Sequence, residues 1–580
     1  MVLADDIQSK IQEWTNAPYE EDCINDIRRL VESQDEEELI ERFAVNMKFG
    51  TGGLRGIIRN GTNGMNVYVI AKATQGIANY IKNQKIVDPK AVIAYDSRRF
   101  SKEFARKTAQ VLASNGIKTF LFKNMRPTPE LSFALRYLGC NTGIVITASH
   151  NPKEYNGFKV YWEDGAQIIA PHDQNIISEV EKINLLNEVQ SNDFENLVKN
   201  GLIEWIEKET DRAYLDEILK LAINYEEIQK SHVKIVYTPL HGTGSTLVPR
   251  ALKELGFKNI LYVEEQMQED PDFSTVKKPN PEEKAALSMA IELAEKENAD
   301  LVIATDPDAD RMGIAVKDEN GDFQIISGNH IGSILEYYII TELKKRRQLP
   351  ENGAVVKTIV TTKLQDIIAL ENGLDVFNVL TGFKYIGQKI RNFEDDGDHT
   401  YVFGGEESYG YLNGTYARDK DAVSASLLIA ECFAYLKNQG RTIIDYLEEI
   451  FTKYGYFDDK TISIDILGLK GTKIIQQIMR HFRSTPPAKI CGLDVIGSVD
   501  YDVDLVFDRL DSKYSLPKAN VLQYILADDS MITLRPSGTE PKIKLYFSVM
   551  AESKQECQSK LADFENNFIP EIKKLIQELS

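Results

Sequence analysis

Apolar positions in the first part of the chain switch repeatedly between helical and strand spacing. The helical spacing predicts helices near residues 68–84 and 101–115. Short β-branched runs at residues 91–95, 118–122 and 142–146 predict buried strands between and after these helices. Helices that alternate with short apolar strands are typical of α/β packing.

The same alternation continues further along the chain and then changes. Strands are predicted at residues 232–237, 301–305 and 354–360, with a helix near 330–345. After about residue 455 alternating strands dominate, at residues 460–465, 531–534 and 542–547, before a closing helix near 552–578.

These changes of pattern divide the chain into five expected parts. Residues 1–46 carry Ile and Leu at helical spacing among acidic residues, which predicts a helical N-terminal extension. We expect α/β domains at residues 47–205, 206–325 and 326–455 and a C-terminal domain at residues 456–580. A chain of 580 residues fits about four domains.

Composition and charge narrow the class of partner. An apolar fraction of 43% and a charged fraction of 27% are those of a globular protein with several cores. The formal net charge of −20 argues against nucleic acid or an anionic membrane as the main partner. An anionic ligand would therefore need a local cluster of cations.

The cysteines and the N-terminal sequence predict a cytoplasmic protein. The five cysteines are scattered and never form a CxxC pair, which favours reduced thiols over a disulfide or zinc framework. The first residues lack the basic and apolar regions of a secretory signal. No apolar run approaches the roughly 20 residues of a membrane span.

Candidate chemistry begins at residues 147–152, which follow the strand predicted at 142–146. Ser149 should lie on a loop at the strand's end, with His150 beside it and Lys159 ten residues further on. A hydroxyl in this setting is placed to carry a transferable group or to attack one. Taken alone, a Ser-His pair in a loop is more often a polar turn.

Three carboxylates follow the strand predicted at 301–305. Asp306, Asp308 and Asp310 alternate along one loop and form a hard, oxygen-only cation site. An EF-hand is excluded, because Arg311 replaces the glycine at loop position six and Lys317 replaces the glutamate at position twelve. Mg²⁺ that shares its ligands with a phosphate oxygen fits better.

Several further loops carry groups suited to a phosphate or a sugar. Residues 49–56 contain four glycines and Arg55, and form either a phosphate contact or a plain turn. Glu406 and Ser408 offer an acceptor and a donor for neighbouring sugar hydroxyls. Arg535, in residues 535–541, begins a tight turn whose hydroxyls and backbone N–H groups suit a phosphate.

Together, residues 147–152 with Lys159, 306–311, 405–408 and 535–541 resemble the four signature loops of the α-D-phosphohexomutase superfamily, in the family's order. The fuller wording, including residues 381–384 and 419–421, is most similar to the bacterial α-phosphoglucomutase and phosphopentomutase branch. The resemblance implies three related mixed α/β domains and a smaller C-terminal α+β domain, of the TATA-box-binding-protein-like type, around a central cleft.

The resemblance also implies roles for individual residues. Ser149 matches the phosphoserine, which shares a Mg²⁺ ion with Asp306, Asp308 and Asp310. The catalytic group comprises Ser149, His150, Lys159, Arg55, Arg311 and Lys420. The substrate-binding group comprises Thr381, Gly382, Lys384, Glu406, Ser408, Arg535, Ser537, Gly538 and Thr539. Some relatives place a histidine just after the sugar loop; here Tyr409 follows Ser408, so Lys420 is our substitute for proton handling.

The implied reaction interconverts α-D-glucose 1-phosphate and glucose 6-phosphate through an enzyme phosphoserine and glucose 1,6-bisphosphate. A pentose phosphate is the alternative substrate, which would make the chain a phosphopentomutase. A phosphatase and a non-catalytic sugar-phosphate sensor or scaffold are alternatives of other classes. We expect small phosphosugars as partners and a monomer or weak dimer.

Overall fold

The computed structural model describes residues 3–16, 18–183, 186–466, 471–503, 516–537 and 542–579. Within these ranges, no helix is long and apolar enough to cross a membrane. The chain forms two compact units. The first comprises Met1–Ala222, His232–Lys317 and Thr415–Leu427, and the second comprises Ile223–Ser231, Asp318–Gly414 and Leu428–Ser580.

The first unit begins with the three helices that the N-terminal pattern predicts. They are α1 (Asp5–Trp14), α2 (Glu21–Ser33) and α3 (Glu36–Phe43). Trp14 stacks on Tyr19 with ring centroids 4.4 Å apart, and both rings also contact Tyr68. Tyr68 lies at the start of the next helix, so this small aromatic core attaches the N-terminal helices to the rest of the unit.

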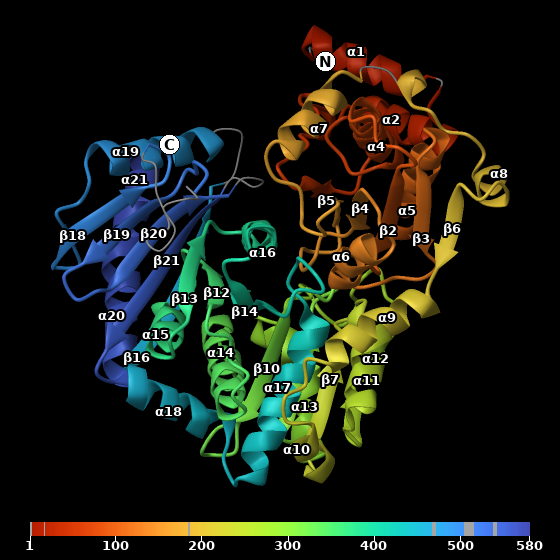
Figure 1. Ribbon diagram of the computed structural model, residues 1–580. Helices are drawn as coiled ribbons and strands as arrows, with labels where there is room; N and C mark the ends of the chain where they lie inside the picture. The colour runs from red at the N-terminus through yellow and green to blue at the C-terminus, as the bar shows by residue number, and fades with distance from the viewer. Residues whose placement is uncertain are drawn as a thin grey trace. The chain divides into compact units, whose positions relative to one another are not determined.

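A mixed sheet with the order β1-β5-β4-β2-β3-β6 follows (Figure 1). Its strands are β1 (Gly53–Ile57), β2 (Lys90–Tyr95), β3 (Lys118–Phe122), β4 (Thr142–Ile146), β5 (Tyr155–Trp162) and β6 (Ile203–Ile206). Strands β2, β3, β4 and β6 run parallel, whereas β5 is antiparallel to both β4 and β1.

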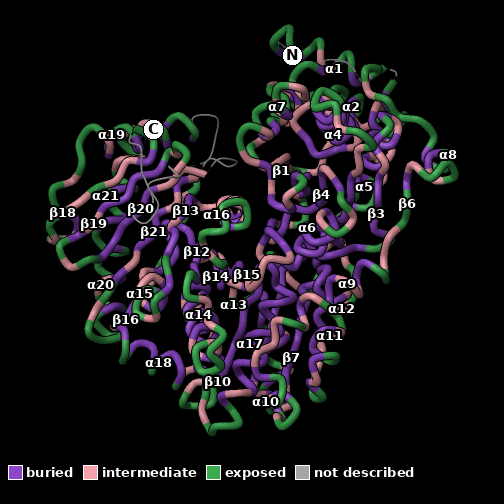
Figure 2. Tube along the Cα trace, viewed as in Figure 1, coloured by how far each residue is buried: buried purple, intermediate pink, exposed green. Residues whose placement is uncertain are grey.

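Alternation along the strands decides which helices cover each face of this sheet. The helices are α4 (Val67–Asn83), α5 (Ser101–Ser114), α6 (Thr128–Tyr137), α7 (His172–Glu181), α8 (Phe194–Lys199) and the 3₁₀ helix η1 (Leu186–Glu188). Ile93 and Ile144 point to the face covered by α4, α5, α7 and α8. Val92, which precedes Ile93, and Val145, which follows Ile144, point to the opposite face, which α6 covers. Both faces are therefore buried, and β4 is purple throughout in Figure 2.

Two segments expected as loops are strands of this sheet. Residues 53–57 form β1 and residues 155–162 form β5, in register with Arg55 opposite Gly157. A Cβ on Gly157 would lie 2.4 Å from the Thr147 carbonyl oxygen, so this glycine permits close backbone approach inside the sheet. Arg55 and Lys159 are consequently fixed on adjacent strands instead of on mobile turns.

A second sheet in the first unit carries the aspartate turn. Within the unit its order is β10-β9-β7-β8, and only β10 is antiparallel. The strands are β7 (Lys234–Thr238), β8 (Asn259–Tyr262), β9 (Leu301–Thr305) and β10 (Met312–Lys317). The helices are α9 (Lys208–Leu219), α11 (Gly244–Leu255), α12 (Glu264–Met267) and α13 (Lys284–Lys296). The turn from β9 into β10 holds residues 306–311.

The second unit contains a further α/β sheet with the order β13-β12-β14-β15. Its strands are β12 (Gly353–Thr358), β13 (Asp375–Val379), β14 (Thr400–Glu406) and β15 (Gly410–Asn413). The other elements here are β11 (Phe323–Ile325), α10 (Tyr225–Lys230), α14 (Gly328–Lys345), α15 (Lys363–Glu371), α16 (Phe383–Asp396) and α18 (Ile443–Tyr454). Along the chain, α17 (Ala422–Asn438) leads from the first unit into the second.

The C-terminal part of the second unit is an antiparallel sheet with the order β16-β21-β20-β19-β18-β17. Its strands are β16 (Tyr456–Asp465), β17 (Lys489–Ile490), β18 (Leu493–Asp500), β19 (Leu522–Leu526), β20 (Met531–Pro536) and β21 (Lys542–Ala551). The helices are α19 (Gly471–Ser484), α20 (Lys554–Asp563), the π-helix η2 (Phe564–Phe568) and α21 (Ile569–Leu579). Three α/β sheets and one antiparallel sheet confirm the predicted fold class.

Candidate functional site

Ser149 lies on a buried turn directly after β4. Its backbone is left-handed, with φ of +52°, and its N–H donates to Thr147 Oγ1 at 2.8 Å. Its Oγ donates to Asp306 Oδ2 at 2.7 Å and lies 3.2 Å from His150 Nδ1. The structure therefore brings together a hydroxyl, an imidazole and a carboxylate from segments 157 residues apart.

The three predicted metal ligands are adjacent and buried. One ligand oxygen from each of Asp306, Asp308 and Asp310 lies within 4.8 Å of the others. Asp306 Oδ1 accepts the N–H groups of Asp310 and Arg311, each at 3.0 Å, which closes the turn. Asp308 Oδ1 and Asp310 Oδ1 are buried and accept no hydrogen bond among the described residues.

The charges of this turn fit a divalent cation. Burial, together with the charges of Asp308 and Asp310, raises the pKa of Asp306 well above its usual range. Burial opposes ionisation of Asp310 as well, but Lys159, Lys420 and Arg311 hold its pKa well below its usual range. Three carboxylates with unused oxygens are the hard donor set that Mg²⁺ takes, and a cation among them would relieve their repulsion.

Two lysines of the predicted catalytic group contact the aspartates. Lys159 Nζ donates to Asp308 Oδ2 at 2.7 Å and to Asp310 Oδ2 at 3.0 Å. Lys420 Nζ lies 3.0 Å from Asp310 Oδ2 and 3.3 Å from Asp419 Oδ1. Burial disfavours the charge on Lys159, but Asp308 and Asp310 outweigh it and raise its pKa. Both lysines are therefore placed as cations beside the aspartate turn.

The remaining catalytic candidates lie on the same side of the unit but differ in their partners. Arg55 Nη1 donates to Asn151 Oδ1 at 3.3 Å, two residues after Ser149. Arg311 Nη1 donates to Glu282 Oε1 at 2.5 Å. Burial, then the charges of Arg311 and Arg55, lowers the pKa of His150 well below its usual range, so its imidazole is neutral at pH 7.

Three residues that the sequence did not single out as site residues hold the candidates in place. Arg98 donates to backbone carbonyls of the Ser149 loop, including Ser149 O at 2.6 Å. Thr128, at the start of α6, binds Asp308 Oδ2 through its Oγ1 at 2.9 Å. Tyr161 donates its hydroxyl to Asp419 Oδ2 at 2.6 Å. Each acts on a residue far away in the sequence, so no local sequence pattern could have indicated them.

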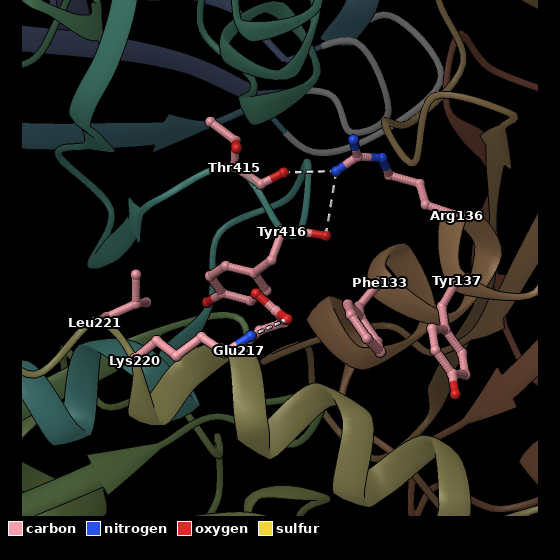
Figure 3. Close-up of a pocket in the computed structure, with 8 residues that line it drawn as sticks. All are labelled: Phe133, Arg136, Tyr137, Glu217, Lys220, Leu221, Thr415 and Tyr416. Atoms are coloured by element: carbon pink, nitrogen blue, oxygen red, sulfur yellow. Dashed lines mark hydrogen bonds and ion pairs between the residues drawn. The ribbon is translucent and has the colours of Figure 1, made fainter.

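Residues 415–421 bring Lys420 to this site and are tied to the first unit at several points. Arg136 on α6 donates to Thr415 O at 2.5 Å and to Tyr416 O at 3.3 Å (Figure 3). Tyr214 on α9 donates to Asp421 Oδ2 at 2.7 Å. We call residues 415–421 the lysine segment.

A cavity of about 370 Å³ opens beside the lysine segment. It is lined by Phe133, Arg136, Tyr137, Glu217, Lys220, Leu221, Thr415 and Tyr416 (Figure 3). None of the predicted site residues lines it. Its Arg136 donates to the backbone of the lysine segment, and its Lys220 donates to Glu217. The cavity therefore belongs to the support of the segment and not to the reacting groups.

The predicted sugar-binding loops meet in the second unit. Glu406, at the end of β14, accepts the N–H of Gly382 at 3.0 Å, and Gly382 has φ of +122°. Thr381 and Gly382 precede α16, on whose first turn Lys384 lies, and Ser408 lies in the turn between β14 and β15. The two loops are thus joined by one hydrogen bond to the carboxylate proposed to bind the sugar.

Arg535 is close to this pair. It lies on β20, and its Nη1 donates to Tyr546 Oη at 3.3 Å. Burial, then the charge of Glu407, raises the pKa of Tyr546, and Arg535 and Glu406 also act on the same hydroxyl. The Ser537 N–H donates to Lys542 O at 2.9 Å. Gly538 and Thr539, also predicted to bind phosphate, lie outside the described residues.

Comparisons with known proteins identify the family of this chain. Three models of the phosphoglucomutase/phosphomannomutase family, for alpha/beta/alpha domains I, II and III, match residues 46–187, 212–321 and 327–454. The phosphoglucomutase of Staphylococcus saprophyticus is 38% identical over 94% of this chain and 98% of its own length. That of Staphylococcus aureus strain MRSA252 is 41% identical over 90% and 93%.

Solved structures show the same fold at lower identity. A phosphoglucomutase/phosphomannomutase family protein from Burkholderia thailandensis has a TM-score of 0.63 at 19% identity and covers 91% of this chain and 97% of its own. Parafusin, a phosphoglucomutase from Paramecium, has a TM-score of 0.66 at 19% identity and covers 92% and 95%. With its four loops in order and family domains matched in sequence, the chain belongs to the α-D-phosphohexomutase superfamily.

Proposed function

We propose that this chain is an α-phosphoglucomutase that interconverts α-D-glucose 1-phosphate and glucose 6-phosphate. The observation that carries the proposal is the Ser149 hydroxyl, hydrogen-bonded to Asp306 within the buried aspartate turn. Relatives 38–41% identical over most of the chain bear the name phosphoglucomutase, which supports glucose phosphates as substrates.

In the proposed reaction, phosphorylated Ser149 gives its phosphoryl group to the free hydroxyl of a sugar monophosphate. A bond forms between the sugar oxygen and phosphorus, and the bond from phosphorus to Ser149 Oγ breaks. The sugar hydroxyl loses its proton to a base, and Ser149 Oγ takes up a proton to become a hydroxyl again. The product is glucose 1,6-bisphosphate. After the bisphosphate reorients, the phosphoryl group that the substrate originally carried is transferred to Ser149. The phosphate thus moves between positions 1 and 6 of the sugar, and no phosphoryl donor is consumed overall.

Residues beside Ser149 suit this transfer. His150 Nδ1, 3.2 Å from Ser149 Oγ, is placed to hold the proton at that oxygen when Ser149 attacks the bisphosphate. Lys159 and Lys420 place positive charge where the transferring phosphoryl group develops negative charge on its outer oxygens. The contacts of Lys159 with two carboxylates favour this electrostatic role over a role as base.

We propose that Asp306, Asp308 and Asp310 hold Mg²⁺ together with an oxygen of phosphorylated Ser149. Such an ion would supply charge neutralisation at the phosphoryl oxygens. In the second unit, Glu406 and Ser408 would bind sugar hydroxyls. Thr381, Gly382 and Lys384 would complete that loop, and Arg535 and Ser537 would bind the phosphate that is not reacting.

Substitution of the nucleophile tests the proposal. Ser149→Ala should abolish interconversion of the two glucose phosphates and remove the added phosphate mass from the intact protein, while substrate binding persists. Ser288→Ala, at an exposed position of α13, is the matched control and should behave as wild type. Near-wild-type turnover in Ser149→Ala would overturn the assignment.

A comparison of substrates separates the proposal from the pentose alternative. We expect kcat/KM for glucose 1-phosphate to exceed that for ribose 1-phosphate, because an acceptor and a donor two residues apart match adjacent hexose hydroxyls. A higher value for ribose 1-phosphate would assign the chain as a phosphopentomutase. Phosphate release without isomerisation would instead assign it as a phosphatase.

A further inference from the structure

The guanidinium group of Arg98 is surrounded by the backbone of the Ser149 loop. Its Nη2 donates to Ser149 O at 2.6 Å and to Asn151 O at 2.5 Å. Its Nη1 donates to Pro152 O at 2.8 Å and to Tyr155 O at 3.0 Å. Four carbonyl groups from seven consecutive residues therefore converge on one side chain.

The guanidinium is itself fixed. The Arg98 side chain is 0% exposed, and its Nε lies 3.3 Å from Asp96 Oδ2. Asp96 Oδ1 accepts the Arg98 N–H at 3.0 Å and the Ser101 hydroxyl at 2.7 Å. The ring of Phe273 lies 4.9 Å from the guanidinium carbon. A planar group with this many partners has one orientation, which a lysine in its place could not reproduce.

These contacts act on the strained residue of the loop. A left-handed serine is strained and persists only when its surroundings enforce it. The peptide before Ser149 is held by its N–H on Thr147 Oγ1, and the peptide after it is held by its carbonyl on Arg98. Arg98 also engages carbonyl oxygens that would otherwise be available to face an anion on Ser149.

We propose that Arg98 is a positioning residue for phosphoryl transfer, which fixes the Ser149 loop so that the phosphorylated Oγ is presented to the sugar hydroxyl and not to water. This inference rests on the proposed function of Ser149. Arg98 donates to the backbone and not to Oγ, so its effect is exerted through the loop.

Loss of this contact has a defined chemical consequence. With a loosened loop, the bond from phosphorus to Ser149 Oγ would still break, but a water oxygen would form the new bond in place of the sugar oxygen. The products are inorganic phosphate and the free Ser149 hydroxyl, whose oxygen takes up the proton that the attacking water loses. The ratio of phosphate released to sugar interconverted therefore measures positioning.

The test compares Arg98→Met and Arg98→Lys with Arg99→Met. Arg99 is adjacent, but its side chain is 53% exposed and its partner Asp272 is also on the surface, which makes it a matched control. In both Arg98 variants we expect kcat to fall by about 10²-fold, the cost of a misplaced reacting group, and the phosphate-release ratio to rise. KM for glucose 1-phosphate should change by less than about threefold, because ground-state binding is retained.

Each outcome has a fixed reading. Folded Arg98 variants, judged by near-ultraviolet circular dichroism, whose kcat and phosphate-release ratio equal those of Arg99→Met would overturn the proposal, as would a rise in KM alone. If neither Arg98 variant folds, Asp96→Asn tests the positioning role instead. This variant keeps the size of the side chain and removes the charge that orients Arg98. It should raise the release ratio, and an unchanged ratio would overturn the proposal. Absence of turnover in both wild type and Arg99→Met would refute the proposed function instead.

Discussion

At the scale of single residues, the site depends on unused oxygen atoms. Asp308 and Asp310 each keep a buried carboxylate oxygen that accepts no hydrogen bond from the part of the chain that the structure describes, while their other oxygens bind Lys159. Buried polar atoms are rarely left without partners. The two free oxygens therefore indicate where a cation would bind.

Removal of divalent metal should stop turnover, and added Mg²⁺ should restore it. In Asp308→Asn the Mg²⁺ concentration that gives half-maximal rate should rise. Loss of a residue that only supports a metal ligand lowers metal affinity by about 10- to 100-fold, so loss of a ligand should cost at least as much. Mg²⁺ should also raise the melting temperature of wild type and raise it less in the variant. Asp216→Asn, at an exposed position of α9, is the control.

Full activity after chelation, or a melting temperature that Mg²⁺ leaves unchanged in wild type, would contradict the metal assignment. The two measurements are independent, because the melting temperature requires no turnover.

At the scale of elements, strands and the turns that follow them position the candidate site residues. The sequence pattern predicted most strands, since β-branched runs and alternation are local properties. It did not predict β1 or β5. The four glycines of residues 49–56 indicated a loop, whereas here Gly53 permits the close approach of these two strands. Motifs likewise identified Ser149 and the aspartates, which are local in sequence. Arg98 and Tyr161 act only through contacts made after folding, so no local pattern marks them.

Strand β5 also supports the lysine segment, through the hydroxyl of Tyr161. Tyr161→Phe leaves Asp419 without this donor, at a cost of about 1–3 kcal/mol. We expect a lower melting temperature and a lower kcat with a smaller change in KM, because Lys420 loses its fixed neighbour. Tyr225→Phe, half exposed on α10, is the control. Equal kcat values in the two variants would contradict the support that we assign to Tyr161.

Strand β16 carries a buried acid that makes stability depend on pH. Burial raises the pKa of Asp459 from 3.8 to about 7. The folded chain therefore keeps a proton that the unfolded chain releases, and stability falls as pH rises from 3.8 to about 7.

Asp459→Asn removes this dependence. The variant should melt at a higher temperature than wild type at pH 8, by at most the equivalent of about 4 kcal/mol, and the difference should shrink toward pH 4. Melting curves at both values check the sign. A variant less stable than wild type at pH 8 would contradict a raised pKa for Asp459 in the folded chain.

At the scale of the whole molecule, charge is distributed unevenly. The chain carries a formal net charge of −20, yet Lys159, Lys420, Arg55 and Arg98 gather around the Ser149 loop and the aspartate turn. This meets the requirement for a local cluster of cations that the composition alone imposed. The division into four domains at the predicted boundaries stays a prediction. The boundary expected between residues 205 and 206 falls inside strand β6.

The lysine segment lies in the last of three separate stretches of sequence that form the first unit. Residues 415–427 belong to this unit, although nearly a hundred residues of the other unit precede them in the chain. A fragment that stops at Lys317 would contain the serine and all three aspartates, yet lack Lys420 and leave the hydroxyls of Tyr161 and Tyr214 facing an unfilled groove. Such a fragment should gain stability from a synthetic peptide spanning residues 415–427, whereas a scrambled peptide should have no effect. A nonsense mutation directly after Lys317 would therefore produce a chain that keeps Ser149 and the three aspartates but lacks Lys420.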